Sequence, residues 1–526
     1  MKVSLKRDAR RWIIIITVSV FSIPCREGVN GRMSMVGFDN EKYIRTQSEH
    51  IRKRMAEFGG KLYMEFGGKL FDDYHASRVL PGFEPDSKLR MLLQLKDQAE
   101  IVIAVSADAI TQQKRRGDIG ITYDLEVLRL IDLFRGVGLY VGNVVVTQYQ
   151  GQPSADDFIR RLADLEIPCY KHYMIEGYPH NIPLIVSKDG FGKNDYIPTT
   201  RSLIVVTAPG PGSGKMAACL SQLYHEHQRG VAAGYAKFET FPIWNIPLKH
   251  PINLAYEAAT ADLNDVNMID PFHLEAYQEV TVNYNRDIEI FPVLQAIFRQ
   301  IYGESPYKSP TDMGVNMAGT CISDDAVCSL ASCQEIVRRY YQALCARKKG
   351  DEKDEEIHKL EMLMHQSGYS TEDYEVAAAA RSVEAQTGEP AAAIQLPDGQ
   401  IIVGKNKDLL GASSAMLLNA LKVVAGLPDD VLMLASNVIK PVQELKVSYL
   451  GSQNPRLHTD ETLVALSVSA ANDENARKAL ACLPLLKNCS AHCSVILSPV
   501  DDSVFRKLRI NMTSEPKYQG NKLYHP

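Results

Sequence analysis

Nine residues near the middle of the chain have the composition of a phosphate-binding turn. They run from Thr207 to Lys215 and read Thr-Ala-Pro-Gly-Pro-Gly-Ser-Gly-Lys. Glycines in such a turn let several backbone N–H groups point at one position, and a lysine adds a full positive charge there. The sequence therefore predicts a site for a nucleotide or another phosphorylated small molecule. Its candidate binding residues are Gly210, Gly212, Ser213, Gly214 and Lys215.

The turn departs from the P-loop pattern G-x-x-x-x-G-K-S/T at two positions. Pro209 stands where the first glycine belongs, and Met216 stands where a hydroxyl would bind magnesium. A cradle of backbone amides survives these changes better than a standard magnesium site does. The candidate cofactor is ATP or another nucleotide, with magnesium doubtful. The alternative is a glycine-rich turn that binds nothing.

Polar residues downstream of the turn are candidates for catalysis together with Lys215. Lys237 and Glu239 end an apolar run, and Asp270 and His273 lie in a segment rich in Asn, Asp, His and Tyr. In a phosphoryl-transfer site such residues neutralise phosphate charge, hold magnesium or position the acceptor. No tight spacing identifies a metal, so the metal stays unknown. A buried, hydrogen-bonded Asp-Pro turn is the alternative for Asp270.

Two polar loops offer a different site. Lys69 and Asp72 follow an apolar run that ends at Phe66, and Asp118 ends a charged loop that begins at Lys114. With His273 they could form the site of an enzyme that acts on a phosphorylated metabolite without a P-loop. Solvated loops are the alternative for both.

The elements around these residues predict the architecture that positions them. Apolar runs alternate with helical patterns from residue 61 to residue 239, which predicts a parallel, doubly wound α/β sheet. Ligands of such sheets bind at the carboxyl ends of the strands. We therefore expect Lys69, Asp118 and Lys215 to face one cleft. The predicted strands are 61–66, 101–105, 143–147, 168–173, 203–206 and 234–239, and the predicted helices include 87–98, 123–134 and 155–165.

The length of 526 residues predicts about three domains. Residues 35–320 are expected to form the α/β domain that carries the glycine-rich loop, and residues 321–385 a helical region. Residues 386–526 are expected to form a C-terminal α/β domain, with a hairpin over 393–403 and a strand over 494–497. Residues 1–34 form an N-terminal extension outside these domains.

Composition excludes some classes of partner. Hydrophobic residues make up 45% and charged residues 23% of the chain, which are globular values, and the net charge of −5 offers no basic face to nucleic acid. The expected partner is a phosphorylated small molecule, and a homo-oligomer is a further candidate. Singly placed cysteines favour the cytoplasm. We expect no contact with a membrane after residue 35.

The first residues favour a different compartment. Five basic residues precede an apolar stretch at 12–23, which has the charge and length of a signal peptide. A working signal would send the chain along the secretory route and make Asn488 a glycosylation site. A start codon assigned too early is the alternative, and it would place the true start near Met35.

Several long blocks resemble one bacterial family, catalogued as domain of unknown function 1846. The resemblance extends from about Met35 to the C-terminus and implies an α/β protein with a helical insert and a C-terminal α/β domain. It supplies no reaction. The resembling blocks are Val36 to Tyr43, Tyr63 to His75, Arg116 to Asp124, Ala208 to Lys215, Lys237 to Trp244, Asn267 to Glu275, Ser309 to Asn316 and Asn454 to His458.

The reaction class stays open between alternatives. The order of loop, helix and strand ending in Lys237-Phe-Glu239 is also similar to P-loop synthetases and kinases of the dethiobiotin synthetase type, which implies phosphoryl transfer or ATP-dependent ligation. A peptidase is disfavoured because neither H-E-x-x-H nor G-x-S-x-G occurs. The alternative outside enzymes is an assembly protein whose loop holds a regulatory anion or packs against a neighbouring subunit.

Overall fold

The computed structural model describes residues 36–68, 70–71, 73–116 and 120–520. Its contacts divide between Ser332 and Cys333 into two compact units, which we call the N-terminal unit and the C-terminal unit. Lys69, Asp72, Asp118 and the extension 1–34 lie outside the described residues. A cleft shared by Lys69, Asp118 and Lys215 therefore stays a prediction.

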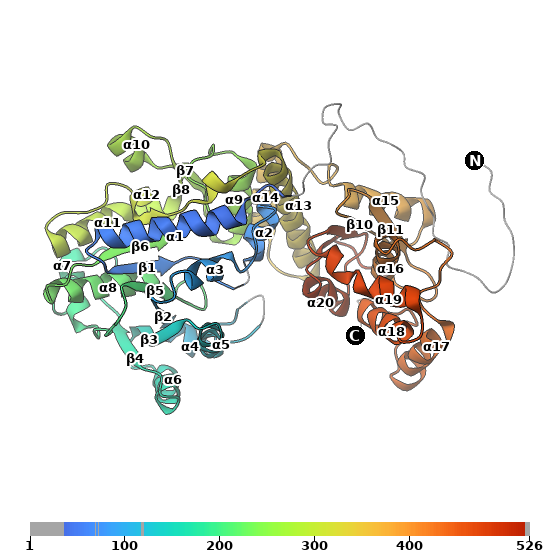
Figure 1. Ribbon diagram of the computed structural model, residues 1–526, viewed down its shortest axis with the longest axis horizontal. Coiled ribbons are helices and arrows are strands. Elements are labelled where there is room, and N and C mark those ends of the chain that lie inside the picture. Colours follow the sequence, from blue (N-terminus) through green and yellow to red (C-terminus); the bar gives the residue numbers. More distant parts are fainter. Residues whose placement is uncertain (1–35, 69, 72, 117–119, 521–526) are drawn as a thin grey trace. The chain divides into compact units, whose positions relative to one another are not determined.

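Within the described residues, a seven-stranded parallel sheet forms the centre of the N-terminal unit, in the order β4-β3-β2-β5-β1-β6-β9. Figure 1 shows β4, β3, β2, β5, β1 and β6 following one another across the unit in this order. Every residue of β1, β2, β5 and β6 is buried, as expected for a sheet covered on both faces. The predicted parallel α/β sheet is confirmed. The strands are β1 (Leu62–Phe66), β2 (Ala99–Ser106), β3 (Tyr140–Tyr149), β4 (Cys169–Tyr173), β5 (Leu203–Thr207), β6 (Gly234–Phe238) and β9 (Gly314–Val315).

The order of the strands shows that the sheet is doubly wound. The chain passes from β1 to β2, β3 and β4 in one direction along the sheet, and from β5 to β6 in the other. Right-handed crossovers in opposite directions place their helices on opposite faces. The carboxyl ends of β5, β1 and β6 lie side by side where the direction reverses, which is where such folds bind ligands.

One face of the sheet is covered by α8 (Lys215–Gln228) and α11 (Asn285–Tyr302). Tyr63 and Tyr235 on the strands pack there with Leu220 of α8 and Phe298 of α11. The crossovers of the other face include α3 (Ser87–Leu93), which contacts α1 (Asn40–Glu57), and α5 (Tyr123–Gly136), which contacts β2 and β3. None of the described helices is both long and apolar enough to cross a lipid bilayer. The other α-helices described in this unit are α2 (Tyr74–Val79), α4 (Ala107–Thr111), α6 (Pro153–Asp164), α7 (Ile182–Ile185), α9 (Pro251–Ala259) and α12 (Pro310–Met313).

A small antiparallel hairpin follows β6 in the chain. It pairs β7 (Asn267–Ile269) with β8 (Val282–Tyr284), and α10 (Pro271–Tyr277) connects the two strands. None of the residues of α10 is buried, and Figure 1 shows this helix away from the sheet. The hairpin leads Tyr284 directly into the start of α11.

The C-terminal unit has a sheet of its own, in the order β11-β10-β12-β13. The first two strands, β10 (Ala391–Gln395) and β11 (Ile401–Lys405), form the predicted hairpin, and β12 (Ser490–Cys493) pairs parallel with β13 (Asn511–Ser514). The helices are α13 (Asp325–Lys349), which spans the boundary between the units, α14 (Asp354–Ser367), α15 (Glu375–Thr387), α16 (Ala412–Val424), α17 (Ser436–Glu444), α18 (Thr459–Ala470), α19 (Glu474–Ala481) and α20 (Pro499–Lys507).

The prediction of a strand at 494–497 is wrong, because the strand lies at Ser490–Cys493. The strand β12 ends at Cys493, and the amide of Ser494 donates to the carbonyl of Ala391, the first residue of β10. Residues after Ser494 extend beyond Ala391, where β10 begins. The strand β10 therefore offers them no pairing partner. Val495 is buried in the core without pairing, which explains why the run looks like a strand in the sequence.

Candidate functional site

The turn between β5 and α8 is held by contacts from two other elements. Thr147, near the end of β3, donates its hydroxyl to the carbonyl of Ser213 at 2.9 Å, and Ser213 donates to the carbonyl of Gly210 at 2.8 Å. A Cβ atom on Gly210 would collide with the hydroxyl oxygen of Tyr123, so a larger residue there would require the tyrosine side chain to move. Gly214 caps α8 with a φ of 76°. These contacts fix the backbone of the turn.

The amides of this turn are open. No acceptor in the described part of the chain pairs with the N–H groups of residues 212–217. The N–H groups of residues 214–217 are the four that an α-helix leaves without intrahelical acceptors at its start. The N–H groups of residues 212 and 213 add two more donors from the turn. Together with the dipole of α8, these N–H groups favour an anion at this position.

The ammonium group of Lys215 faces the carboxylate of Glu65 at the end of β1. Nζ lies 3.9 Å from Oε1, and the two side chains are only 15% and 11% exposed. The other oxygen of Glu65 accepts a hydrogen bond from the Tyr235 hydroxyl at 2.8 Å. Because 3.9 Å is too long for a direct hydrogen bond, the Lys215 ammonium still has its donors for a ligand.

A buried group of charges adjoins Lys215, and we call it the Lys237 cluster. It consists of Glu65, Lys237, Glu239, Tyr284 and Asp287. Glu65 and Lys237 are register partners on β1 and β6, so their side chains lie on the same face of the sheet. Lys237 Nζ lies 2.9 Å from Glu239 Oε1 and also contacts the Asp287 carboxylate and the Tyr284 hydroxyl.

The Lys237 cluster contains one lysine and three carboxyl groups, all of them buried. Burial raises the pKa of Glu239 to about 7, with Lys237 opposing the shift and Asp287 adding to it. Burial alone would lower the pKa of Lys237, but Asp287 and Glu239 raise it well above its usual value. A carboxyl group that titrates near neutral pH can accept or donate a proton in a reaction.

Asp270 and His273 lie elsewhere in the N-terminal unit. Asp270 caps α10, because its Oδ1 atom accepts from the amides of Phe272 and His273 at 3.0 Å, and its Oδ2 atom accepts from the Thr311 hydroxyl at 2.7 Å. His273 Nδ1 lies 2.8 Å from the Ser309 hydroxyl. Among the described residues, no contact joins either side chain to Lys215 or to the Lys237 cluster. Asp270 has the buried, hydrogen-bonded position that the sequence left as its alternative.

Three members of the Lys237 cluster were missed in the sequence. The sequence did contain a sign of the role of Glu65. A charged residue within the apolar run 62–66 needs a partner if that strand is buried on both faces. Tyr284 belongs to the polar segment but carries no spacing that marks it. Asp287 lies in the first turn of α11, where an acidic residue is common at any helix start.

The described cysteines and acidic residues form no further candidate centre. Nine cysteines lie in the described part of the chain, and none of them forms a disulfide there. No group of three His, Cys, Asp or Glu side chains among the described residues could hold a metal ion.

Comparison with known proteins identifies the family. The description "Domain of unknown function DUF1846, N-terminal" matches residues 36–368, and its C-terminal counterpart matches residues 372–524. A UPF0371 protein of Corynebacterium urealyticum is 57% identical over 490 residues, which cover 93% of this chain and 99% of the relative. A UPF0371 protein of Streptococcus thermophilus is 55% identical over 492 residues, which cover 94% of this chain and 100% of the relative. The chain therefore belongs to the DUF1846 family.

Proposed function

We propose that the N-terminal unit is an enzyme domain that binds a nucleotide or another phosphorylated small molecule. The phosphate lies at the turn 208–214, where the amides of residues 212–217 are open and Lys215, the first residue of α8, adds a positive charge. The set of open amides at the carboxyl end of β5 is the observation that carries the proposal. A preformed set of donors binds phosphate well because little conformational freedom is lost on binding.

Magnesium is not needed for this mode of binding. Met216 stands where a P-loop supplies a hydroxyl ligand, and the hydroxyls of Thr147 and Ser213 are used to hold the turn. The positive charge that faces the phosphate comes from Lys215 and the dipole of α8. We therefore expect the affinity for the phosphorylated compound to change little when magnesium is removed.

The Lys237 cluster is the reactive side of the proposed site. Glu65 connects it to the turn, since this carboxylate faces Lys215 and is the register partner of Lys237. In a phosphoryl transfer or a ligation, Glu239 accepts the proton of the attacking group, and Lys237 offsets the negative charge that develops. Asp270 keeps its place as the cap of α10 and has no part in this chemistry.

A ligand screen followed by calorimetry tests the proposal. Thermal shifts with nucleotides and sugar phosphates, with and without magnesium, identify the best compound. Calorimetry then compares the wild type with Lys215→Ala and with Lys249→Ala, which removes an exposed lysine of the same unit. Loss of charge-assisted hydrogen bonds worth about 1.5–3 kcal/mol each should weaken binding to Lys215→Ala at least tenfold. The control should bind as the wild type does.

Two outcomes would contradict the proposal. The wild type could bind no phosphorylated compound, or Lys215→Ala could bind the best compound as tightly as the wild type. In either case the turn is structural, and the assembly-protein alternative takes its place. Substrate-dependent turnover by the wild type, lost in Glu239→Gln while binding is kept, would establish the enzymatic part.

A further inference from the structure

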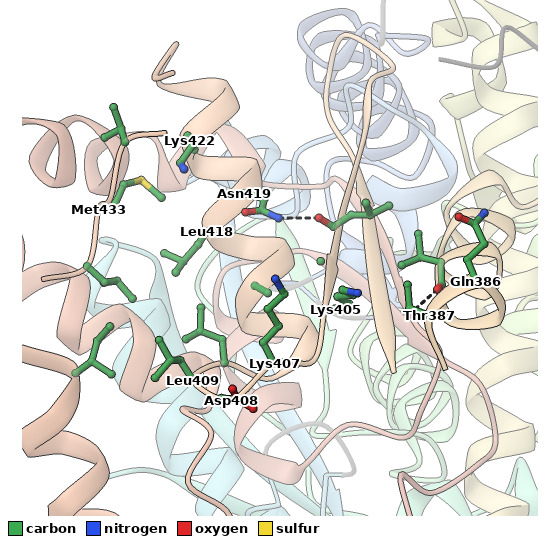
Figure 2. Close-up of a pocket in the computed structure, with 18 residues that line it drawn as sticks. Gln386, Thr387, Lys405, Lys407, Asp408, Leu409, Leu418, Asn419, Lys422 and Met433 are labelled. Atoms are coloured by element: carbon green, nitrogen blue, oxygen red, sulfur yellow. Dashed lines mark hydrogen bonds between the residues drawn. The ribbon is translucent and has the colours of Figure 1, made fainter. Parts of the chain in front are cut away.

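A pocket of about 290 Å³ opens on the C-terminal unit beside α16. Figure 2 shows its lining, which comes from α15, β11, the loop after β11, α16, the segment before α17 and α17 itself. Most of the lining is apolar, and Leu418 and Met433 are also part of the core of this unit. An apolar pocket with a few polar groups is the usual form of a small-molecule site.

Three lysines face this apolar pocket. Lys405 ends β11, Lys407 follows it in the loop, and Lys422 lies near the end of α16. Figure 2 shows Lys405 and Lys407 next to each other beside α16. Among the described residues, no carboxylate lies within ion-pair distance of either ammonium group. Lys422 donates to the backbone carbonyl of Asp429 at 2.9 Å.

The surroundings of Lys407 and Lys422 disfavour the charged form of each side chain. Burial lowers the pKa of Lys407, and the neighbouring charge of Lys405 lowers it further, with Asp408 opposing. Burial also lowers the pKa of Lys422, which Asp429 and Asp430 oppose. Like charges that meet beside apolar surface repel each other, and an anion placed between them would remove that repulsion.

The loop that carries Lys407 is held in place. Arg456 donates through Nε to the carbonyl of Lys407 at 2.9 Å, and the amide of Leu457 donates to the carbonyl of Leu409 at 2.9 Å. Asn406 accepts from the amide of Ala412 at 2.7 Å and so ties the loop to the start of α16. The block from Asn454 to His458 thus positions the lysine beside the pocket, which a binding site requires.

We propose that this pocket binds a small organic anion with an apolar body and a single carboxylate or phosphate head. The apolar lining takes the body, and Lys405 and Lys407 take the head. The inference is independent of the phosphate site in the N-terminal unit, because it uses none of those residues. It assigns a second ligand-binding site to the chain.

Calorimetry with simple probes on the full chain tests the affinity. Octanoate and octyl phosphate are the anionic probes, octanol has the tail without the charge, and acetate has the charge without the tail. Both anions should bind, and octanol and acetate should bind at least tenfold more weakly. In the series from butanoate to octanoate, each added methylene should tighten binding about fourfold, the factor that corresponds to about 0.8 kcal/mol.

Variants and a footprint locate the bound anion. Lys407→Gln and Lys405→Gln should each weaken octanoate binding at least tenfold, while Lys478→Gln, an exposed lysine of the same unit, should leave it unchanged. Octanoate should also protect Lys405 and Lys407, but not Lys478, from acetylation read by mass spectrometry. Circular dichroism checks that each variant is folded.

The result that would overturn the proposal is equally direct. The proposal would be wrong if the folded wild type bound neither anion, or if octanol bound as tightly as octanoate. Unchanged octanoate binding in both lysine variants, with no protection of Lys405 or Lys407, would place any bound anion elsewhere. Binding of only one of the two anions would support the site and identify its head group.

Discussion

Glu65 and Lys215 carry opposite charges 3.9 Å apart, between the end of β1 and the first residue of α8. The carboxylate belongs to β1, the strand that pairs with β5, and the lysine begins the helix that follows the turn. A phosphate at the turn would therefore share Lys215 with Glu65. It would also be repelled by this carboxylate, because both are negative.

Replacing Glu65 by glutamine should tighten phosphate binding. The amide keeps an oxygen that can accept from Tyr235, so the packing of β1 and β6 is retained. Removing a repulsion on the order of 1 kcal/mol should lower Kd about fivefold. Calorimetry with the best ligand of the wild type measures the change, and Glu275→Gln is the control for the loss of one exposed carboxylate. Equal affinities of Glu65→Gln and wild type would show that the anion does not lie near Lys215.

Two glycines of the turn should respond differently to alanine. Both have a positive φ, 78° at Gly212 and 76° at Gly214, so each substitution strains the backbone by roughly 1 kcal/mol. A Cβ atom on Gly214 would also lie 2.8 Å from the Thr147 hydroxyl oxygen, whereas Gly212 has open space. Urea unfolding should therefore show a larger loss of stability for Gly214→Ala. Equal losses would mean that Thr147 moves aside without cost.

The Lys237 cluster should make stability depend on pH. The pKa of Glu239 is raised by burial from 4.5 to about 7, so the folded protein keeps a proton that the unfolded chain releases in this range. The free energy of unfolding of the wild type should then fall, relative to Glu239→Gln, as the pH rises through this window. Urea unfolding at several pH values measures the difference between the two proteins. A difference that is constant with pH would contradict the raised pKa.

His458 should stabilise the C-terminal unit at low pH. Its Nδ1 atom lies 3.0 Å from Asp501 Oδ2, and this hydrogen bond raises the pKa of His458 above 6.5, although burial opposes the shift. The added stability is present below that value and is lost as the pH rises through the raised pKa. His458→Gln should cost roughly 1 kcal/mol or more at pH 5.5 and less at pH 8.5. The exposed His365→Gln is the matched control, and an equal cost at both pH values would argue against the charge-assisted bond.

Much of the architecture could be predicted from the sequence, because buried parallel strands are continuous apolar runs. The strand at Leu203–Thr207 and the hairpin at 391–405 were found in this way, since turns rich in Gly, Pro and Asp interrupt the apolar pattern. The strand expected at 494–497 shows the limit. Val495 is buried like a strand residue, but the hydrophobicity of a run does not show whether a partner strand extends alongside it.

The candidate site was predictable only in part. Lys237 and Glu239 stand at the end of one apolar run, Lys215 ends the glycine-rich turn after another, and the parallel sheet brings such ends together. Asp287 approaches Lys237 from α11, after a long excursion of the chain, and no local spacing encodes that contact. Asp270 and His273 were chosen for their chemical type alone. Asp270 is used as the cap of α10, and the ring of His273 contacts the Ser309 hydroxyl.

The position of β1 has a consequence for how the chain acquires this fold. Leu62 pairs with Leu203 on one side and with Gly234 on the other, so both partners of the strand are synthesised about 140 residues or more after it. Contacts so distant in sequence form late and slow the folding of a domain. While the ribosome is still producing the intervening segment, β1 has two unpaired apolar edges that can associate with other chains. We expect nascent chains shorter than about 240 residues to depend on chaperones, and release of such truncated chains to lead to aggregation.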